Sequence, residues 1–130
     1  MAITYITSSD ITDDVVKALS AAVTARVATI EDDVNDLAER KGITSSEIYT
    51  TTIHHMIKRW CVAVVCRDIC LDKMGVNNLE MASEDKYKVK YDTYRNLVSQ
   101  YESQITPEIL TGSVAGARTR STGVGRLLAG

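Results

Sequence analysis

The chain has 130 residues, of which 45% are apolar and 25% are charged, and its formal net charge is -2 at neutral pH. These values fit one globular domain and exclude a disordered chain or a disulfide-rich secreted scaffold. The sequence has no Phe, six Tyr and one Trp, so its core must be aliphatic and rich in Ala, which favours helices over a β-sandwich.

The N-terminus shows no targeting signal. The opening stretch MAITYITSSD lacks the basic start and the apolar run of a signal peptide. No run of eighteen apolar residues exists that could cross a membrane. We therefore expect a cytosolic protein without membrane association.

The first third of the chain predicts two helices. Asp13 and Asp14 suit the N-terminus of a short leading helix, where negative charge is favourable. An amphipathic helix is predicted at about 20–41, because apolar residues recur at helical spacing with acidic residues between them. Ser20 can cap its start, and Gly42 follows its cationic last turn as a stop signal.

The middle of the chain predicts one long helix. Thr44 and Glu47 have the spacing of a capping box, and nothing from there to Gly75 breaks a helix. Some thirty residues at 1.5 Å each would span roughly 45 Å. The central stretch WCVAVVCRDIC is apolar on nearly every side, so we expect this helix to be surrounded by other elements or subunits.

After a loop rich in turn-forming residues, a third main helix carries a heptad seam. Its apolar positions step by four and three residues along the helix. The seam is either a core contact within the chain or a subunit interface, where Tyr is enriched, and its spacing allows both. Thr106 and Pro107 then mark the start of a short last helix. The seam residues are Tyr87, Tyr91, Tyr94, Val98, Tyr101 and Ile105.

The cysteines and histidines of the long helix raise the question of a metal or catalytic site. Imidazole and thiolate are common zinc ligands, but structural zinc normally takes ligands from two segments, and the five candidates all lie on one. A nucleophile and a base eight or more residues apart along one straight helix are also more than about 9 Å apart. We therefore expect buried structural cysteines, no metal, no cofactor and no catalytic residue. The five residues are His54, His55, Cys61, Cys66 and Cys70.

The acidic run EDDVNDLAE has two interpretations, a metal site or a solvated helix face. No turn in it carries the alternating oxygen donors of a calcium loop, which favours the solvated face. If the domain forms a ring around DNA, such a face could line the channel, because a negative wall lets the polyanion slide without binding it. The acidic residues are Glu31, Asp32, Asp33, Asp36 and Glu39.

The last twenty residues differ in composition from the rest. All seventeen acidic residues and twelve of the fifteen basic ones lie in 1–110, whereas 111–130 contain three Arg, five Gly and no acidic residue. A segment with so few apolar residues cannot offset its ordering entropy alone. We predict a helical bundle domain at 1–110 and an extended arm at 111–130 that a partner orders. Its arginines could contact nucleic-acid phosphates or an acidic protein surface.

The order of these elements resembles a known family. The chain contains YITSSDIT and a short helix, an acidic helix, a long apolar helix with IKRWCVAVVCRDIC, the stretch DKYKVKYDTYRNLVSQ, a TPEILTG turn and a Gly/Arg tail. In this order the sequence resembles the head-to-tail connector proteins of long-tailed bacteriophages, also called adaptor or head-completion proteins. The resemblance covers nearly the whole chain and includes no catalytic signature.

The resemblance implies an all-α bundle of three main helices and a short leading helix, with a structural and non-enzymatic role. It implies a twelve-fold ring of copies below the portal protein, a tail-side neck or head-closure partner, and DNA passing through without specific binding. It places the protein in the virion neck, assembled in the host cytoplasm. The arm would dock on the portal through Thr111, Gly112, Arg118, Arg120, Gly123, Gly125, Arg126, Leu127 and Leu128.

Two other function classes stay open on sequence. One is a DNA-binding packaging accessory that uses the basic arm, which a steep salt dependence of duplex binding would reveal. The other is a small enzyme or metal protein built on the Cys/His helix, which metal analysis would reveal.

Overall fold

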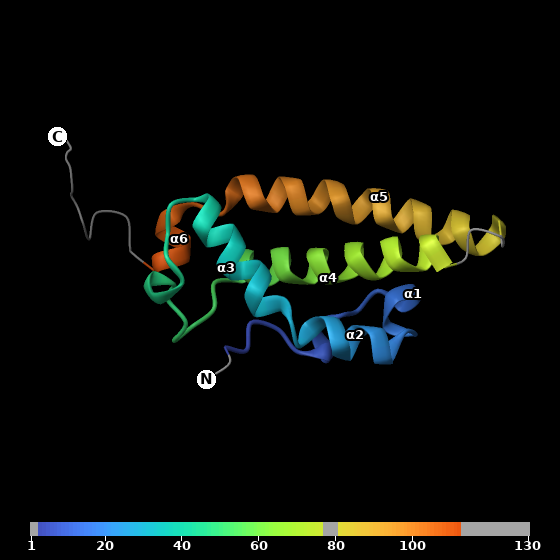
Figure 1. Cartoon of the computed structure of the whole chain (residues 1–130), viewed down its shortest axis with the longest axis horizontal. Coiled ribbons are helices and arrows are strands. Elements are labelled where there is room, and N and C mark those ends of the chain that lie inside the picture. The colour runs from blue at the N-terminus through green and yellow to red at the C-terminus, as the bar shows by residue number, and fades with distance from the viewer. Residues whose placement is uncertain (1–2, 77–80, 113–130) are drawn as a thin grey trace.

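The computed structural model describes residues 3–76 and 81–112, and within these residues all regular elements are helical. Figure 1 shows α4 and α5 side by side as a long antiparallel pair, with the shorter helices of the N-terminal half along α4. The all-α fold predicted from the sequence is confirmed. The elements are η1 (Ser8–Asp10), α1 (Asp14–Lys17), α2 (Ser20–Val27), α3 (Ile30–Arg40), η2 (Ser45–Glu47), α4 (His55–Val76), α5 (Met81–Gln104) and α6 (Pro107–Thr111).

The leading helix α1 begins where its acidic residues predicted. Asp13 is its N-cap, and the Asp13 carboxylate accepts hydrogen bonds from the backbone N–H groups of Val15 at 2.9 Å and Val16 at 3.2 Å. These bonds satisfy two donors that have no partner inside the helix. The fully buried Val16 then fixes α1 against the core.

The single helix predicted at about 20–41 is wrong, because the chain breaks between α2 and α3. Thr29 donates two hydrogen bonds to the Arg26 carbonyl, from its N–H at 3.1 Å and from its hydroxyl at 3.0 Å. This carbonyl would accept from Ile30 in a continuous helix, so the local bonds compete with it. Ser20 is also not the cap of α2; the N-cap position is Leu19, which has no capping side chain.

The long helix starts about ten residues later than predicted. The capping box of Thr44 and Glu47 is present, but it closes only the 3-10 turn η2, and α4 begins at His55. Three Thr and one Ile fill residues 50–53, and their β-branched side chains disfavour a helical backbone. The result is a helix of 22 residues.

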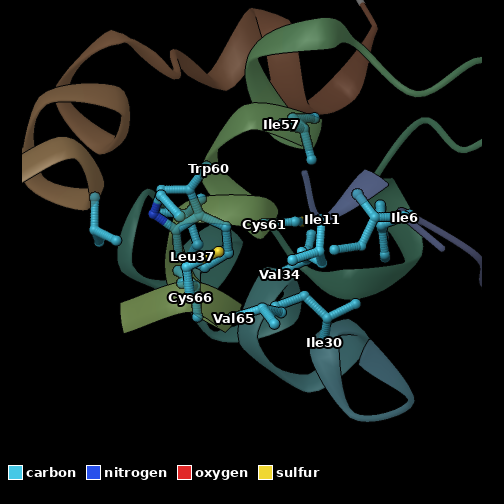
Figure 2. Close-up of a cluster of buried hydrophobic side chains, with 14 of the residues drawn as sticks. Ile6, Ile11, Ile30, Val34, Leu37, Ile57, Trp60, Cys61, Val65 and Cys66 are labelled. Carbon is cyan, nitrogen blue, oxygen red and sulfur yellow. The ribbon is translucent and has the colours of Figure 1, made fainter. Parts of the chain in front are cut away.

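The core lies where α3 and the N-terminal segment pack against α4. Figure 2 shows Trp60, Cys61 and Val65 of α4 among aliphatic side chains of α3, with Ile6 and Ile11 nearby. The residues facing α4 from α3, Val34 and Leu37, are fully buried. An aliphatic core with one aromatic anchor agrees with the composition of the chain.

Trp60 also joins three helices through a polar contact. Its indole N–H donates to the Glu102 carboxylate of α5 at 3.3 Å, and Arg40 at the end of α3 forms an ion pair with the same carboxylate. Trp60 is 2% exposed, so its N–H needs a partner inside the protein. One carboxylate therefore connects α3, α4 and α5.

Candidate interaction surfaces

The three cysteines of α4 are buried and free. Burial raises the pKa of the Cys66 thiol to about 12 and that of Cys70 to about 11, and it also raises the pKa of Cys61. Thiols with such values stay protonated at neutral pH and are poor nucleophiles and poor metal ligands. They fill space in the core, as their apolar sequence context predicted.

The histidines lie apart from the thiols, at the start of α4. The rings of His54 and His55 are stacked, with centroids 4.4 Å apart and planes inclined by 24°. Among residues 3–76 and 81–112, no group of three or more His, Cys, Asp or Glu side chains is arranged to hold a metal ion. The imidazoles and the buried thiols therefore do not combine into one site.

The structure divides the predicted acidic face of α3 into two groups. Glu31 accepts a hydrogen bond from the N–H of Ile3 at 3.1 Å, and Asp33 forms an ion pair with Arg26. Both are turned toward neighbouring segments and are only partly exposed. The remaining three side chains are exposed on the outer side of α3, at spacings of four and three residues, and we call them the acidic stripe: Asp32, Asp36 and Glu39.

Arg26 is the centre of an ion network that fixes this helix. Its guanidinium binds the Asp68 carboxylate of α4 through Nε at 3.0 Å and Nη2 at 2.8 Å, besides pairing with Asp33. Its other terminal nitrogen donates to the hydroxyl of Thr29 at 2.8 Å. These charge-assisted bonds join α2, α3 and α4 at the helix break, so they orient the acidic stripe away from the core.

A second polar cluster, centred on Asp13, holds α1 against α5. The Asp13 carboxylate accepts from Lys90 Nζ at 2.8 Å and from the Tyr94 hydroxyl at 2.6 Å. The same side chain caps α1, so it receives donors from two distant parts of the chain. The sequence contained a signal for the cap, but nothing in it paired Asp13 with residues about eighty positions away.

The predicted heptad seam packs within the chain, and its partly exposed residues leave the predicted subunit contact untested. Tyr87, Val98 and Ile105 are buried, and the other three seam residues are partly buried against the same core. The hydroxyl of Tyr94 lies at Asp13, so the polar tip of this side chain is satisfied internally. The seam is the contact of α5 with α4 and the N-terminal half.

The structure places the first two residues of the predicted arm, Thr111 and Gly112, at the end of α6. Thr106 caps α6, as predicted, by accepting from the N–H of Ile109 at 3.3 Å. The carbonyl of Leu110 accepts from the N–H of Tyr49 at 2.9 Å, and Gly112 ends the helix with φ of 72°. A Cβ added at Gly112 would lie 2.4 Å from Cγ of Tyr49, so the ring packs directly on this glycine.

Most of the predicted arm lies outside the described residues. Thr111 and Gly112 are the last two positions of the described chain, and Thr111 donates through its hydroxyl to the Pro107 carbonyl at 3.0 Å. The other predicted arm residues are not among the described ones, namely Arg118, Arg120, Gly123, Gly125, Arg126, Leu127 and Leu128. Their role as a docking segment stays a prediction.

A shallow groove of about 270 Å³ runs beside α4 and α5. Val62, Ala63 and Leu97 give it an apolar lining, and the exposed Lys58 and Arg59 border it. Asp10, the carboxylate among its lining residues, already accepts from the N–H of Thr7 at 2.8 Å. The groove therefore offers apolar contact, with two cations and the carboxylate of Asp10 among its lining residues.

Comparison of the chain with protein-family models, curated proteins and solved structures finds no match. None of the described helices combines the length and apolarity needed to cross a membrane.

Proposed function

We propose that this protein is a structural virion subunit that forms an adaptor ring between the portal and the tail or neck. The observation that supports this most directly is the division at Gly112. Residues 3–76 and 81–112, which we call the body, have their own core and end in the capped helix α6, whose Leu110 carbonyl is hydrogen-bonded to Tyr49. The segment 113–130, which contains three Arg and no acidic residue, follows the body. Such a body can hold a ring position while the following segment contacts a partner.

The charge distribution fits a channel through which DNA passes. The exposed acidic stripe of Asp32, Asp36 and Glu39 lies on the side of α3 opposite its buried residues, and a wall of such stripes would repel phosphates. A repelled polyanion moves past without the counterion release that drives binding. In this proposal the ring continues the portal channel in the virion neck after assembly in the host cytoplasm, and it needs no cofactor.

The basic residues beyond Gly112 would attach the ring to the portal protein. Arg118, Arg120 and Arg126 can each donate charge-assisted hydrogen bonds, of which a buried example contributes roughly 1.5–3 kcal/mol. Neighbouring copies of the chain and a tail-side neck or head-closure protein are the other proposed partners. Twelve copies is the proposed ring size.

Co-sedimentation with portal rings of the same virus tests this proposal. We would compare the full chain with a truncation after Gly112 and with the triple change Arg118→Ala, Arg120→Ala and Arg126→Ala. A matched control removes three exposed charges from the body by the changes Lys17→Ala, Lys86→Ala and Arg95→Ala. We expect the truncation to abolish binding, the arginine triple to weaken it and the control to bind normally. Unchanged portal binding by the truncation would contradict the proposal.

A DNA-binding packaging accessory is the second candidate, because residues 111–130 contain three Arg and no acidic residue. Three phosphate contacts would give a slope of roughly -2.7 for log affinity against log salt on duplex DNA. Duplex binding by the full chain with such a slope, and its loss in the arginine triple variant, would favour this function over the adaptor.

A further inference from the structure

The N-terminus of α4 is capped by a histidine. Nδ1 of His54 accepts the N–H of Met56 at 3.1 Å, and the His54 carbonyl accepts the N–H groups of Ile57 at 3.0 Å and Lys58 at 3.1 Å. Ser, Thr, Asp and Asn are the usual residues at such a position, and none of these side chains gains or loses a proton near neutral pH. An imidazole can accept this hydrogen bond only while Nδ1 carries no proton.

Protonation of His54 would act against the helix start in three ways. Nδ1 would become a donor facing the donor N–H of Met56, so the cap would be lost. The new positive charge would lie at the positive end of the helix dipole. It would also lie beside His55, whose ring is stacked on it, and one turn before the exposed Lys58. All three effects favour the neutral ring in the folded protein.

The electrostatics agree with this geometry. Burial and the neighbouring His55 both lower the pKa of His54 from its ordinary value of 6.5. A base whose pKa is lower in the folded state than in the unfolded state stabilises the fold in its neutral form. This contribution of His54 is complete above its ordinary pKa and is lost as the pH falls through the folded-state value.

The cap is connected to the junction with residues 113–130. Residues 50–53 carry no regular structure and join His54 to Tyr49, whose N–H is bonded to Leu110 and whose ring packs on Gly112. The N-terminal end of this segment is therefore held by the Tyr49 junction and its C-terminal end by the His54 cap. Release of the cap would weaken the hold at the C-terminal end, where the bonds to the His54 carbonyl and the partly buried Ile53 would remain.

We propose that His54 is a pH-sensitive joint, which when neutral fixes the first turn of α4, and when protonated releases this turn and, through residues 50–53, loosens the Tyr49 junction. The proposal does not depend on the adaptor function. It concerns a conformational change within residues 49–58, whichever partner binds the segment beyond Gly112.

Amide hydrogen exchange on the full chain at pH 7.5 and pH 5 tests the joint, after correction for the pH dependence of intrinsic exchange. The reporters are the N–H groups of Met56 and Tyr49. Loss of a helix cap should lower the protection of Met56 roughly fivefold at pH 5, and that of Tyr49 by a smaller factor. Protection of Met56 that does not change with pH would overturn the proposal.

Two variants separate titration from packing. His54→Asn keeps a capping acceptor and cannot titrate, so the pH dependence at Met56 and Tyr49 should disappear while the fold at pH 7.5 is retained. His55→Asn leaves the cap and removes the neighbouring charge, so the transition should move to higher pH. An undiminished pH response in His54→Asn would overturn the assignment to His54. A response at Met56 without one at Tyr49 would overturn the coupling to the junction.

Discussion

The hydroxyl of Tyr94 donates a 2.6 Å hydrogen bond to the carboxylate of Asp13, so the middle of α5 holds the cap of α1. Lys90, one turn earlier on α5, donates to the same oxygen at 2.8 Å. The side chain of Asp13 is only 9% exposed, and a nearly buried carboxylate needs donors of this kind. The Asp13 side chain thus fixes both the start of α1 and the position of α1 on α5.

Removal of the Tyr94 hydroxyl should destabilise the domain. We expect Tyr94→Phe to lower the free energy of unfolding by about 1.5–3 kcal/mol, the range for a hydrogen bond to a charged group. Urea denaturation followed by circular dichroism measures this change. Tyr101→Phe is the matched control in the same seam. Tyr101 is partly exposed, so loss of its hydroxyl should lower the free energy of unfolding by less than about 0.5 kcal/mol. Equal costs for both variants would show that the bond to Asp13 contributes little.

Asp13 should make stability depend on pH in the acid range. Burial by itself raises the pKa of Asp13, but the hydrogen bonds from Lys90, Tyr94 and the N–H of Val16 outweigh it and lower the pKa to about 2. The folded-state value is below the ordinary 3.8, so the stabilisation is complete above about pH 5 and is lost as the pH falls from 3.8 toward 2. Asp13→Asn should be less stable than the wild type at pH 6, and the difference should shrink by pH 2.5. A constant difference would contradict this account.

Gly112 should tolerate no side chain. Gly112→Ala places a Cβ 2.4 Å from Cγ of Tyr49 at a φ of 72°, so it combines a left-handed backbone cost of about 1–2 kcal/mol with overpacking of about 1–3 kcal/mol. Gly42→Ala is the control, because Gly42 has φ of 82° and a Cβ added there would have no atom within 4 Å. It should show the backbone cost alone. Adding Tyr49→Gly to Gly112→Ala removes Cβ as well as the ring, both of which lie within 3 Å of the new Cβ. The double variant should recover the overpacking part, and failure to recover it would exclude the clash as the cause.

The cysteines should be unreactive in the folded protein. Burial raises the pKa of each thiol, to about 12 for Cys66 and about 11 for Cys70, so a thiol reagent at pH 8 meets almost no accessible thiolate. We expect labelling only after addition of denaturant, with three thiols released together in the unfolding transition. The triple change to Ala should lower stability and leave helicity intact, because it leaves cavities in the core. Rapid labelling without denaturant, or stoichiometric zinc in protein purified without added metal, would contradict this prediction.

The sequence alone predicted the features that depend on a few neighbouring residues. The acidic start of α1 at Asp13, the cap at Thr106, the stop at Gly42 and the burial of the cysteines were all predictable from spacing and residue type. The seam of α5 was also predictable as a pattern, but its partner was not. An apolar face shows that something covers it, and only the fold shows that α4 and the N-terminal half do so.

The sequence-based prediction was wrong where tertiary contacts or competing local bonds override the helical pattern. The spacing of apolar residues runs unbroken from Val23 to Leu37, yet Arg26 bonds to Asp68 of α4 and Thr29 bonds back to Arg26, and the chain bends there. The capping box at Thr44 predicted the start of α4, but its effect is local and does not extend through the β-branched residues 50–53. The predicted acidic face of α3 included Asp33, but a tertiary contact turns this side chain toward Arg26.

The position of Trp60 gives the protein a built-in optical reporter. It is the sole tryptophan of the chain, it is buried, and its indole meets a carboxylate that also binds Arg40. Its emission should be blue-shifted in the native state and should respond to separation of α3, α4 or α5, because each of them contributes to its surroundings. Fluorescence could thus follow assembly or unfolding of this bundle in a mixture with tryptophan-free partners, without attachment of any dye.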